Sequence, residues 1–144
     1  MDEATEERLI KQVIVIRRDL RMRRGKEIAQ GAHASMAWLR QRVLQGLTPT
    51  AATGTTSAAT GLVELSEVER AWLERSNRKV TVKVGSEPEL MAVYEQALRA
   101  GLVVHLITDG GLTEFGGVPT RTCLGIGPDY DDRIDPVTGD LELY

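Results

Sequence analysis

The run Gln12-Val-Ile-Val-Ile16 consists of β-branched residues after its first position, with no alternation between polar and apolar side chains. Continuous apolar runs of this length are typical of a central strand that is buried on both faces of a sheet. Segments with helical and strand-like periodicity follow it in turn, and strands separated by helices imply parallel crossovers. The run therefore predicts an α/β domain built around this strand.

The first helix is expected from about residue 25 to 45. Its apolar positions form one stripe along the helix: Ile28, Ala32, Met36, Leu39 and Val43. A second line on this helix is polar and consists of Lys26, Gln30 and His33, at positions i, i+4 and i+7. That line begins at the helix N-terminus, where free N–H groups and the helix dipole favour anions.

Capping signals and alternation mark the later elements. Ser66 with Glu69, and Ser86 with Glu89, form capping boxes that open helices to about residues 76 and 100. Strands are expected over 79–84, 102–107 and 122–126, the last ended by Gly127-Pro128. The order β-α-α-β-α-β-β predicts a mixed four-stranded sheet with helices on both faces, whose last two strands can pair antiparallel.

Composition limits the class of protein. The 144 residues are 42% apolar and 27% charged, which predicts one globular domain over 1–144, with a flexible Thr/Ala/Gly-rich loop at 46–62. The net charge of −3 means that any surface for nucleic acid is local. Cys123 is the only cysteine, which excludes an internal disulfide and favours a reducing cytoplasm. The longest aliphatic run, 13–16, is far shorter than the ~20 residues of a membrane helix, so we expect no membrane partner.

A basic stretch links the first strand to the first helix. Only Asp19 opposes its six positive charges: Arg17, Arg18, Arg21, Arg23, Arg24 and Lys26. Together with the helix N-terminus, these side chains predict a ledge that binds phosphates. The alternative is a solvated basic loop, which is what most runs of charge are. His33 alone is typical of an interior histidine, but its alignment with Lys26 and Gln30 favours a shared polar pocket.

Asp109 lies just past the strand 102–107, at the sheet edge where α/β proteins bind ligands. A carboxylate there can orient or deprotonate a water molecule, whereas the alternative is a turn-forming residue before two glycines. Three nearby hydroxyls can donate hydrogen bonds: Thr113, Thr120 and Thr122. His105 is expected to be an ordinary sheet-face residue. No serine nucleophile elbow, P-loop or metal-ligand cluster is present in the sequence.

Segments from both halves of the chain form one further pattern: Val13–Leu20, Met22, Gly25-Lys26, Ala29-Gln30, His33-Ala34, Lys79–Val84, Ser86, Glu89-Leu90, Ala100–Leu102, His105–Ile107, Asp109, Thr113, Leu124–Pro128, Ile134-Asp135 and Val137–Leu141. In order and spacing they resemble the class II peptidyl-tRNA hydrolase family. The resemblance implies a mixed four-stranded sheet, often a dimer, and hydrolysis of the ester between peptide and tRNA without metal or cofactor. It also implies active-site positions: Lys26, Gln30, His33, Asp109 and Thr113.

Three features depart from the family pattern. Gly31 stands where a small residue or Cys is usual, and it weakens a helix by about 1 kcal/mol relative to Ala. Leu112 replaces a basic residue, and Glu114 replaces Gln, in the loop after Asp109. The loop to the last strand and the 46–62 loop are also longer than usual. A lost positive charge and a gained negative one should weaken binding of an anionic tRNA end.

These observations give a mechanistic hypothesis. The basic residues Arg18, Arg21, Arg23, Arg24 and Lys26 bind tRNA, with Gln30 and Thr120 also contacting the substrate. Asp109 activates the attacking water, Lys26 or Thr113 stabilises the oxyanion, and His33 supports them. Two alternatives remain: a non-catalytic RNA-binding module that keeps the fold, favoured by Leu112 and Glu114, and an enzyme acting on another ester or small molecule. We expect a cytoplasmic protein and a possible homodimer.

Overall fold

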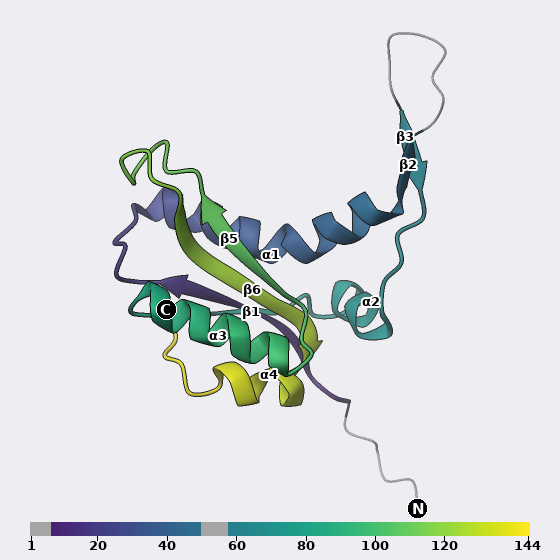
Figure 1. The fold of residues 1–144 in the computed structure, drawn as a ribbon. Helices are drawn as coiled ribbons and strands as arrows, with labels where there is room; N and C mark the ends of the chain where they lie inside the picture. The colour runs from purple at the N-terminus through teal and green to yellow at the C-terminus, as the bar shows by residue number, and fades with distance from the viewer. Residues whose placement is uncertain (1–6, 50–57) are drawn as a thin grey trace, which may run out of the picture.

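Strand β1 (Ile10–Arg17) lies inside a four-stranded sheet of order β4-β1-β6-β5, in a computed structural model that describes residues 7–49 and 58–144 (Figure 1). It pairs in parallel with β4 (Lys79–Val84) and antiparallel with β6 (Thr120–Tyr130). The edge strand β5 (Val104–Asp109) pairs antiparallel with β6. The predicted mixed sheet and its antiparallel last pair are therefore confirmed.

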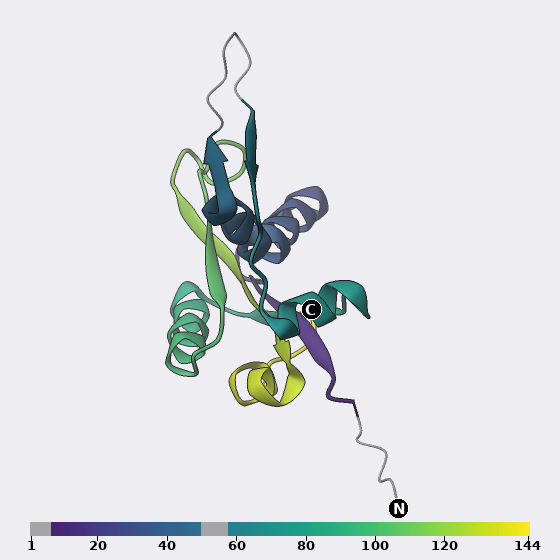
Figure 2. The same ribbon diagram turned by 90° about the vertical axis from the view of Figure 1, so that its right-hand side faces the viewer.

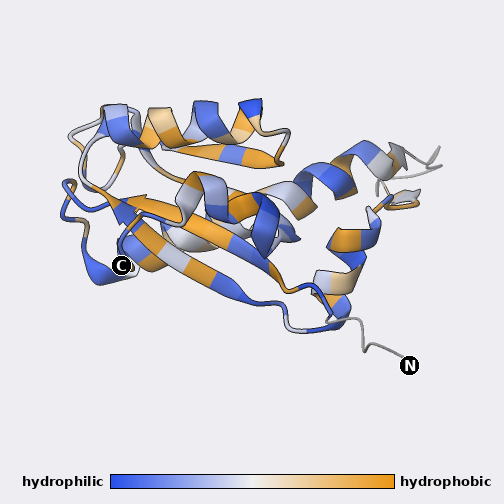
Figure 3. Cartoon of the chain, turned by 90° about the horizontal axis from the view of Figure 1, so that it is seen from below, coloured by the Kyte–Doolittle hydropathy of each residue, from blue (hydrophilic) through white to orange (hydrophobic). Residues whose placement is uncertain are grey.

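Helices cover both faces of this sheet, as predicted (Figure 1). Val13 and Val15 point to the side covered by α3 (Glu87–Arg99) and α4 (Asp131–Thr138). Ile14 and Ile16 point to the side covered by α1 (Arg24–Gly46). A third cluster joins α1 to the short α2 (Glu67–Glu74) through Trp38 and Trp72. Figure 3 shows apolar residues concentrated on the strands of the sheet, whereas the helices carry both polar and apolar residues. Among the described helices, none combines the length and the apolar character needed to cross a bilayer.

The apolar stripe predicted for α1 is wrong. The face of α1 that packs on the sheet consists of Gln30, Ala34 and Trp38, whereas Ile28 is 67% and Met36 61% exposed. The reason is a close approach of helix and sheet, because a Cβ atom on Gly125 of β6 would lie 2.3 Å from the Ala34 carbonyl oxygen. Only a small side chain fits at this contact, so Ala34 occupies it, while Trp38 packs one turn further along and Ile28 and Met36 stay exposed.

Three segments differ from the sequence-based expectation. β6 does not end at Gly127-Pro128 but runs on to Tyr130, with Gly127 in the left-handed region (φ +88°). The helix α4 follows it where none was predicted. Part of the expected 46–62 loop is a two-stranded ribbon of β2 (Leu47–Pro49) and β3 (Ala59–Gly61) that projects from the end of α1 (Figure 2). Residues 50–57 of that loop lie outside the described residues.

Two glycine substitutions test the contact between α1 and β6. Gly31→Ala should raise the free energy of unfolding by up to about 1 kcal/mol, because alanine favours helix and its Cβ would meet only Ile16 Cδ1 at 3.9 Å. Gly125→Ala should lower it by about 1–3 kcal/mol, because the added methyl group overlaps the backbone of Ala34. Urea unfolding measures both, and equal effects of the two substitutions would contradict the packing described above.

Candidate active site

The candidate site lies where the C-terminal end of β5 meets the first turns of α1. Asp109 is the last residue of β5, rather than a residue after the strand as predicted, because β5 is shifted two residues along the chain from the expected 102–107. Lys26 and Gln30 reach it from α1. The sheet edge and the polar helix line, inferred separately from the sequence, therefore meet at one carboxylate.

Lys26 and Asp109 form an ion pair at the centre of the site. Lys26 Nζ donates to Asp109 Oδ1 at 2.7 Å and to Thr113 Oγ1 at 2.8 Å. Both charged side chains are largely shielded, with 15% of Lys26 and 13% of Asp109 exposed. An ammonium group has three N–H donors, so one donor of Lys26 stays available after these two bonds.

Gln30 connects the ion pair to the buried interior. Its Nε2 donates to Asp109 Oδ1 at 3.3 Å, and its Oε1 accepts from the hydroxyl of Thr122 at 2.5 Å. Gln30 is 3% and Thr122 0% exposed. Because the Thr122 hydroxyl bonds the amide oxygen, the amide nitrogen faces Asp109. The neighbouring Cys123 is also buried, which raises the pKa of its thiol to about 11 and makes it a poor nucleophile at neutral pH.

Asp109 is held in its ionised form. The hydrogen bond from Lys26 lowers the pKa of Asp109 below its ordinary value, and partial burial opposes this effect. The N–H of Gly111, 2.8 Å from Asp109 Oδ2, lowers the pKa further, and the electrostatic effect of His33 acts in the same direction. A carboxylate accepts about four hydrogen bonds, and the described contacts use three, which leaves a position on Oδ2 for a water molecule.

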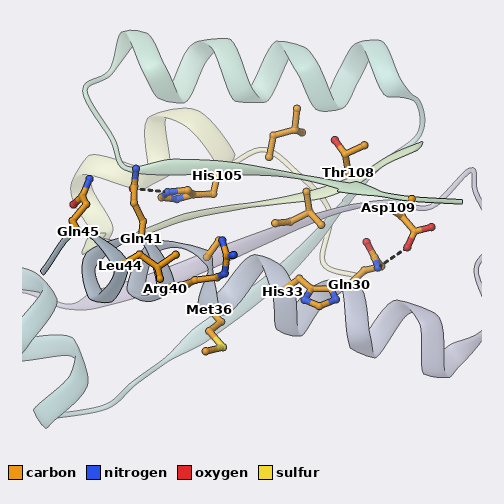
Figure 4. Close-up of a pocket in the computed structure, with 14 residues that line it drawn as sticks. Gln30, His33, Met36, Arg40, Gln41, Leu44, Gln45, His105, Thr108 and Asp109 are labelled. Carbon is orange, nitrogen blue, oxygen red and sulfur yellow. Dashed lines mark hydrogen bonds between the residues drawn. The ribbon is translucent and has the colours of Figure 1, made fainter. Parts of the chain in front are cut away.

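Four of the predicted site residues, Lys26, Gln30, Asp109 and Thr113, are thus brought together, and His33 lies at the margin. His33 lies on exposed surface next to Gln30 and lines a groove that leads away from Asp109 (Figure 4). Thr120 is opposite Asp109 in the register of β5 and β6, and its hydroxyl donates to the Val118 carbonyl oxygen at 2.8 Å. Its hydroxyl hydrogen is therefore directed into its own loop rather than toward Lys26.

The basic stretch divides into two groups. Arg18, Arg21 and Arg24 line one hollow of about 820 Å³ together with Tyr144 and two carboxylates, Asp19 and Glu27. Within residues 7–49 and 58–144, no ion pair engages Arg21 or Arg24. Arg23 points elsewhere, toward Glu114.

Glu114, one of the departures from the family pattern, lies in the loop after β5 and contacts the N-terminal end of α1. It accepts the backbone N–H of Arg23 at 3.3 Å, and its carboxylate lies 3.7 Å from Arg23 Nε. The added negative charge is therefore balanced locally by Arg23 and by the helix N-terminus. Leu112, which replaces a basic residue, is 93% exposed at the surface of the same loop.

Several groups in the site were not assigned from the sequence. The Gly111 N–H and the orienting role of Thr122 depend on loop and strand geometry, for which the sequence gives no spacing signal. Three later residues of α1 that line the groove could have been predicted from the sequence: Ala37, Gln41 and Leu44. They continue the line that Lys26, Gln30 and His33 form along the helix. His105, expected to be an ordinary sheet-face residue, also lines this groove and bonds Gln41 at 2.8 Å. Within the described residues, no three metal-ligating side chains lie close enough to hold an ion.

Comparison with known proteins places these features in a family. The family model described as "Peptidyl-tRNA hydrolase PTH2" matches residues 10–144. A peptidyl-tRNA hydrolase of Methanopyrus kandleri is 40% identical over 136 residues, which cover 94% of this chain and 98% of that protein. One of Methanothermobacter thermautotrophicus is 37% identical over 134 residues, 93% and 99% of the two chains.

A solved structure is similar in fold alone. A protein of unknown function from Agrobacterium tumefaciens C58 aligns with a TM-score of 0.51 at 9% identity, over 94% of this chain and 97% of that one. The family model spans most of this chain and both archaeal relatives exceed 30% identity, and the lysine, glutamine and aspartate implied by the resemblance meet in one site. This chain belongs to the PTH2 family of peptidyl-tRNA hydrolases.

Proposed function

We propose that this chain hydrolyses the ester between peptide and tRNA, with Lys26 and Asp109 as its catalytic residues. The observation that carries this assignment is the shielded ion pair, in which one ammonium donor and one carboxylate lone pair remain available side by side. A substrate carbonyl needs a donor for its developing negative charge and a nearby acceptor for the attacking water, and this pair supplies both.

The reaction then follows from these two groups. A water molecule bonded to Asp109 Oδ2 attacks the ester carbonyl carbon, and the third N–H of Lys26 stabilises the oxyanion. As the water attacks, one of its protons passes by way of Asp109 Oδ2 to the ribose oxygen, and the bond between the carbonyl carbon and that oxygen breaks. The peptide leaves as a carboxylate after the second proton of the water is released to solvent. Thr113 and Gln30 are positioning residues in this scheme, because they fix Lys26 and Asp109. His33, beside Gln30 at the margin of the site, takes no direct part in this scheme.

For tRNA we propose the hollow lined by Arg18, Arg21 and Arg24 as the phosphate-binding surface. Two of these guanidinium groups have no carboxylate partner in the part of the chain that the structure describes, so phosphates need not displace an existing ion pair. Arg23, which Glu114 engages, and Thr120, whose hydroxyl bonds its own loop, contribute less. A homodimer and a cytoplasmic location stay predictions, and sedimentation velocity tests the first.

Removal of either charge at the site should slow turnover by orders of magnitude. Asp109→Asn and Lys26→Met should each lower kcat by about 10²–10³-fold, the usual effect of losing one electrostatic group in a catalytic site. The assay is release of free tRNA from N-acetyl-aminoacyl-tRNA. Asp132→Asn, which breaks an exposed ion pair with Arg8, is the matched control and should keep the wild-type rate. Wild-type protein that binds this substrate without cleaving it would instead support the RNA-binding module.

The ion pair of Asp109 should also make the free energy of unfolding depend on pH in the acid range. Because the folded-state pKa of Asp109 is lowered, its contribution to stability is complete above the unfolded value of about 3.9 and is lost as pH falls through the lower folded value. Urea unfolding of wild type and Asp109→Asn should therefore differ most above about pH 5 and converge in acid. A difference that grows as pH falls would contradict the lowered pKa.

Salt dependence tests the phosphate surface. Replacing both Arg21 and Arg24 by Ala should raise KM for peptidyl-tRNA and reduce the slope of log KM against log salt by about 1 for each arginine. Arg70→Ala, which removes an exposed partner of Glu74 on α2, should leave the slope unchanged. An unaltered slope in the double variant would place the tRNA on another surface.

A further inference from the structure

A groove of about 960 Å³ leads away from the proposed catalytic pair, between α1 and β5. It begins at Gln30 and Asp109 and ends near Leu44 and Gln45 (Figure 4). The proposed mechanism uses only its first end. From residue 30 to residue 44 the helix rises by roughly 21 Å, the length of about six residues of extended peptide.

The wall opposite α1 is the free edge of the sheet. The six consecutive residues 105–110 line the groove, although side chains of a strand alternate between its two faces. Figure 4 shows this alternation, with Thr108 on the α3 side and Asp109 on the α1 side. Alternate residues of β5 can therefore contribute through their backbone. Among the described strands, β5 has a neighbour only on the β6 side.

The register of β5 and β6 identifies backbone groups that face outward. The Gly127 N–H donates to the Val103 carbonyl oxygen at 2.8 Å, so Val103 and Gly127 form a hydrogen-bonded pair. In an antiparallel ladder such pairs alternate with residues whose N–H and C=O point away from the partner strand. Leu106, three residues on, is one of the latter, and it turns both groups into the groove.

The lining of the groove suits a peptide better than a nucleic acid. It is mainly apolar and amide, with Met36, Ala37 and Ile107 beside Gln41 and Gln45. Among the described residues that line it, Arg40 is the only lysine or arginine, whereas binding along a phosphate backbone requires several cations. The basic hollow for which we propose tRNA phosphates shares no lining residue with this groove.

We propose that this groove binds the peptide moiety of the substrate as an additional strand along β5. The proposal rests on the function proposed above, which fixes the direction: the esterified C-terminal residue lies at Lys26 and Asp109, and the peptide runs toward Leu44. Backbone pairing with Leu106 accepts any sequence, while Met36, Ala37 and Ile107 favour apolar side chains. Peptide length, rather than the identity of one residue, then determines how well a substrate binds.

A length series measures this effect. The substrates are one tRNA that carries N-acetylated peptides of one, two, four or six alanines. Wild-type kcat/KM should rise by roughly tenfold from one residue to four, because each added backbone hydrogen bond contributes a few-fold, and should then level off near six. N-methylation of each interior residue in turn should abolish the gain at the position that pairs with Leu106.

Two tryptophan substitutions on α1 complete the experiment. Ala37→Trp fills the groove midway and should bring the ratio of kcat/KM for four residues to that for one residue close to one. Ala32→Trp, on an exposed position outside the groove, should preserve the wild-type ratio.

Each other outcome overturns one specific claim. A flat length series in wild type, with the short substrate still cleaved, overturns the peptide groove but not the hydrolase function. An equal loss on all lengths in Ala37→Trp indicates that tRNA occupies the groove. A length effect that no N-methylation reduces overturns the strand pairing. If wild type cleaves none of the substrates, the proposed function itself fails.

Discussion

Contact between the backbones of α1 and β6 fixes the distance on which the site depends. At Gly125 the sheet has no side chain toward the helix, and Ala34 rests directly on it. This close contact brings the preceding turn of the helix, which contains Gln30, within hydrogen-bond reach of Asp109 and Thr122. A larger residue at this contact would lift the helix, and the whole line of polar groups would move away from β5.

Close seating of α1 also requires that a polar side chain be buried. An unpaired amide in the interior would cost about 1–3 kcal/mol, so the burial of Gln30 is tolerable only because both ends of its side chain are bonded. The same bonds give the amide a single orientation. The hydrogen bonds that make the burial of Gln30 tolerable are therefore the same bonds that position Asp109. Through them, Thr122 orients Gln30, and Gln30 in turn holds Asp109.

Local signals in the sequence were sufficient for much of the fold. The run at 12–16 marked β1, and the Ser66 capping box, present in full, marked the start of α2. The buried face of α1 could not be predicted, because it depends on Gly125, which is far away in the sequence from its contact Ala34. The helix α4 was missed because Pro136 lies inside it, and burial of Ile134 and Val137 stabilises it instead. In the site, Lys26, Gln30 and Asp109 were predictable, since helix spacing and strand ends are local properties.

The lowered pKa of Asp109 restricts what this carboxylate can do. A weakly basic carboxylate deprotonates water poorly before attack, so its main contributions are to orient the water and to hold Lys26. Lys26 in turn keeps its charge beside the reacting carbonyl, where a shielded ammonium stabilises an oxyanion more than it would in water. Binding of an extended peptide along β5 would add to this shielding by covering the open side of the groove. Positioning and charge stabilisation, rather than strong base catalysis, are thus the physical basis of the proposed reaction.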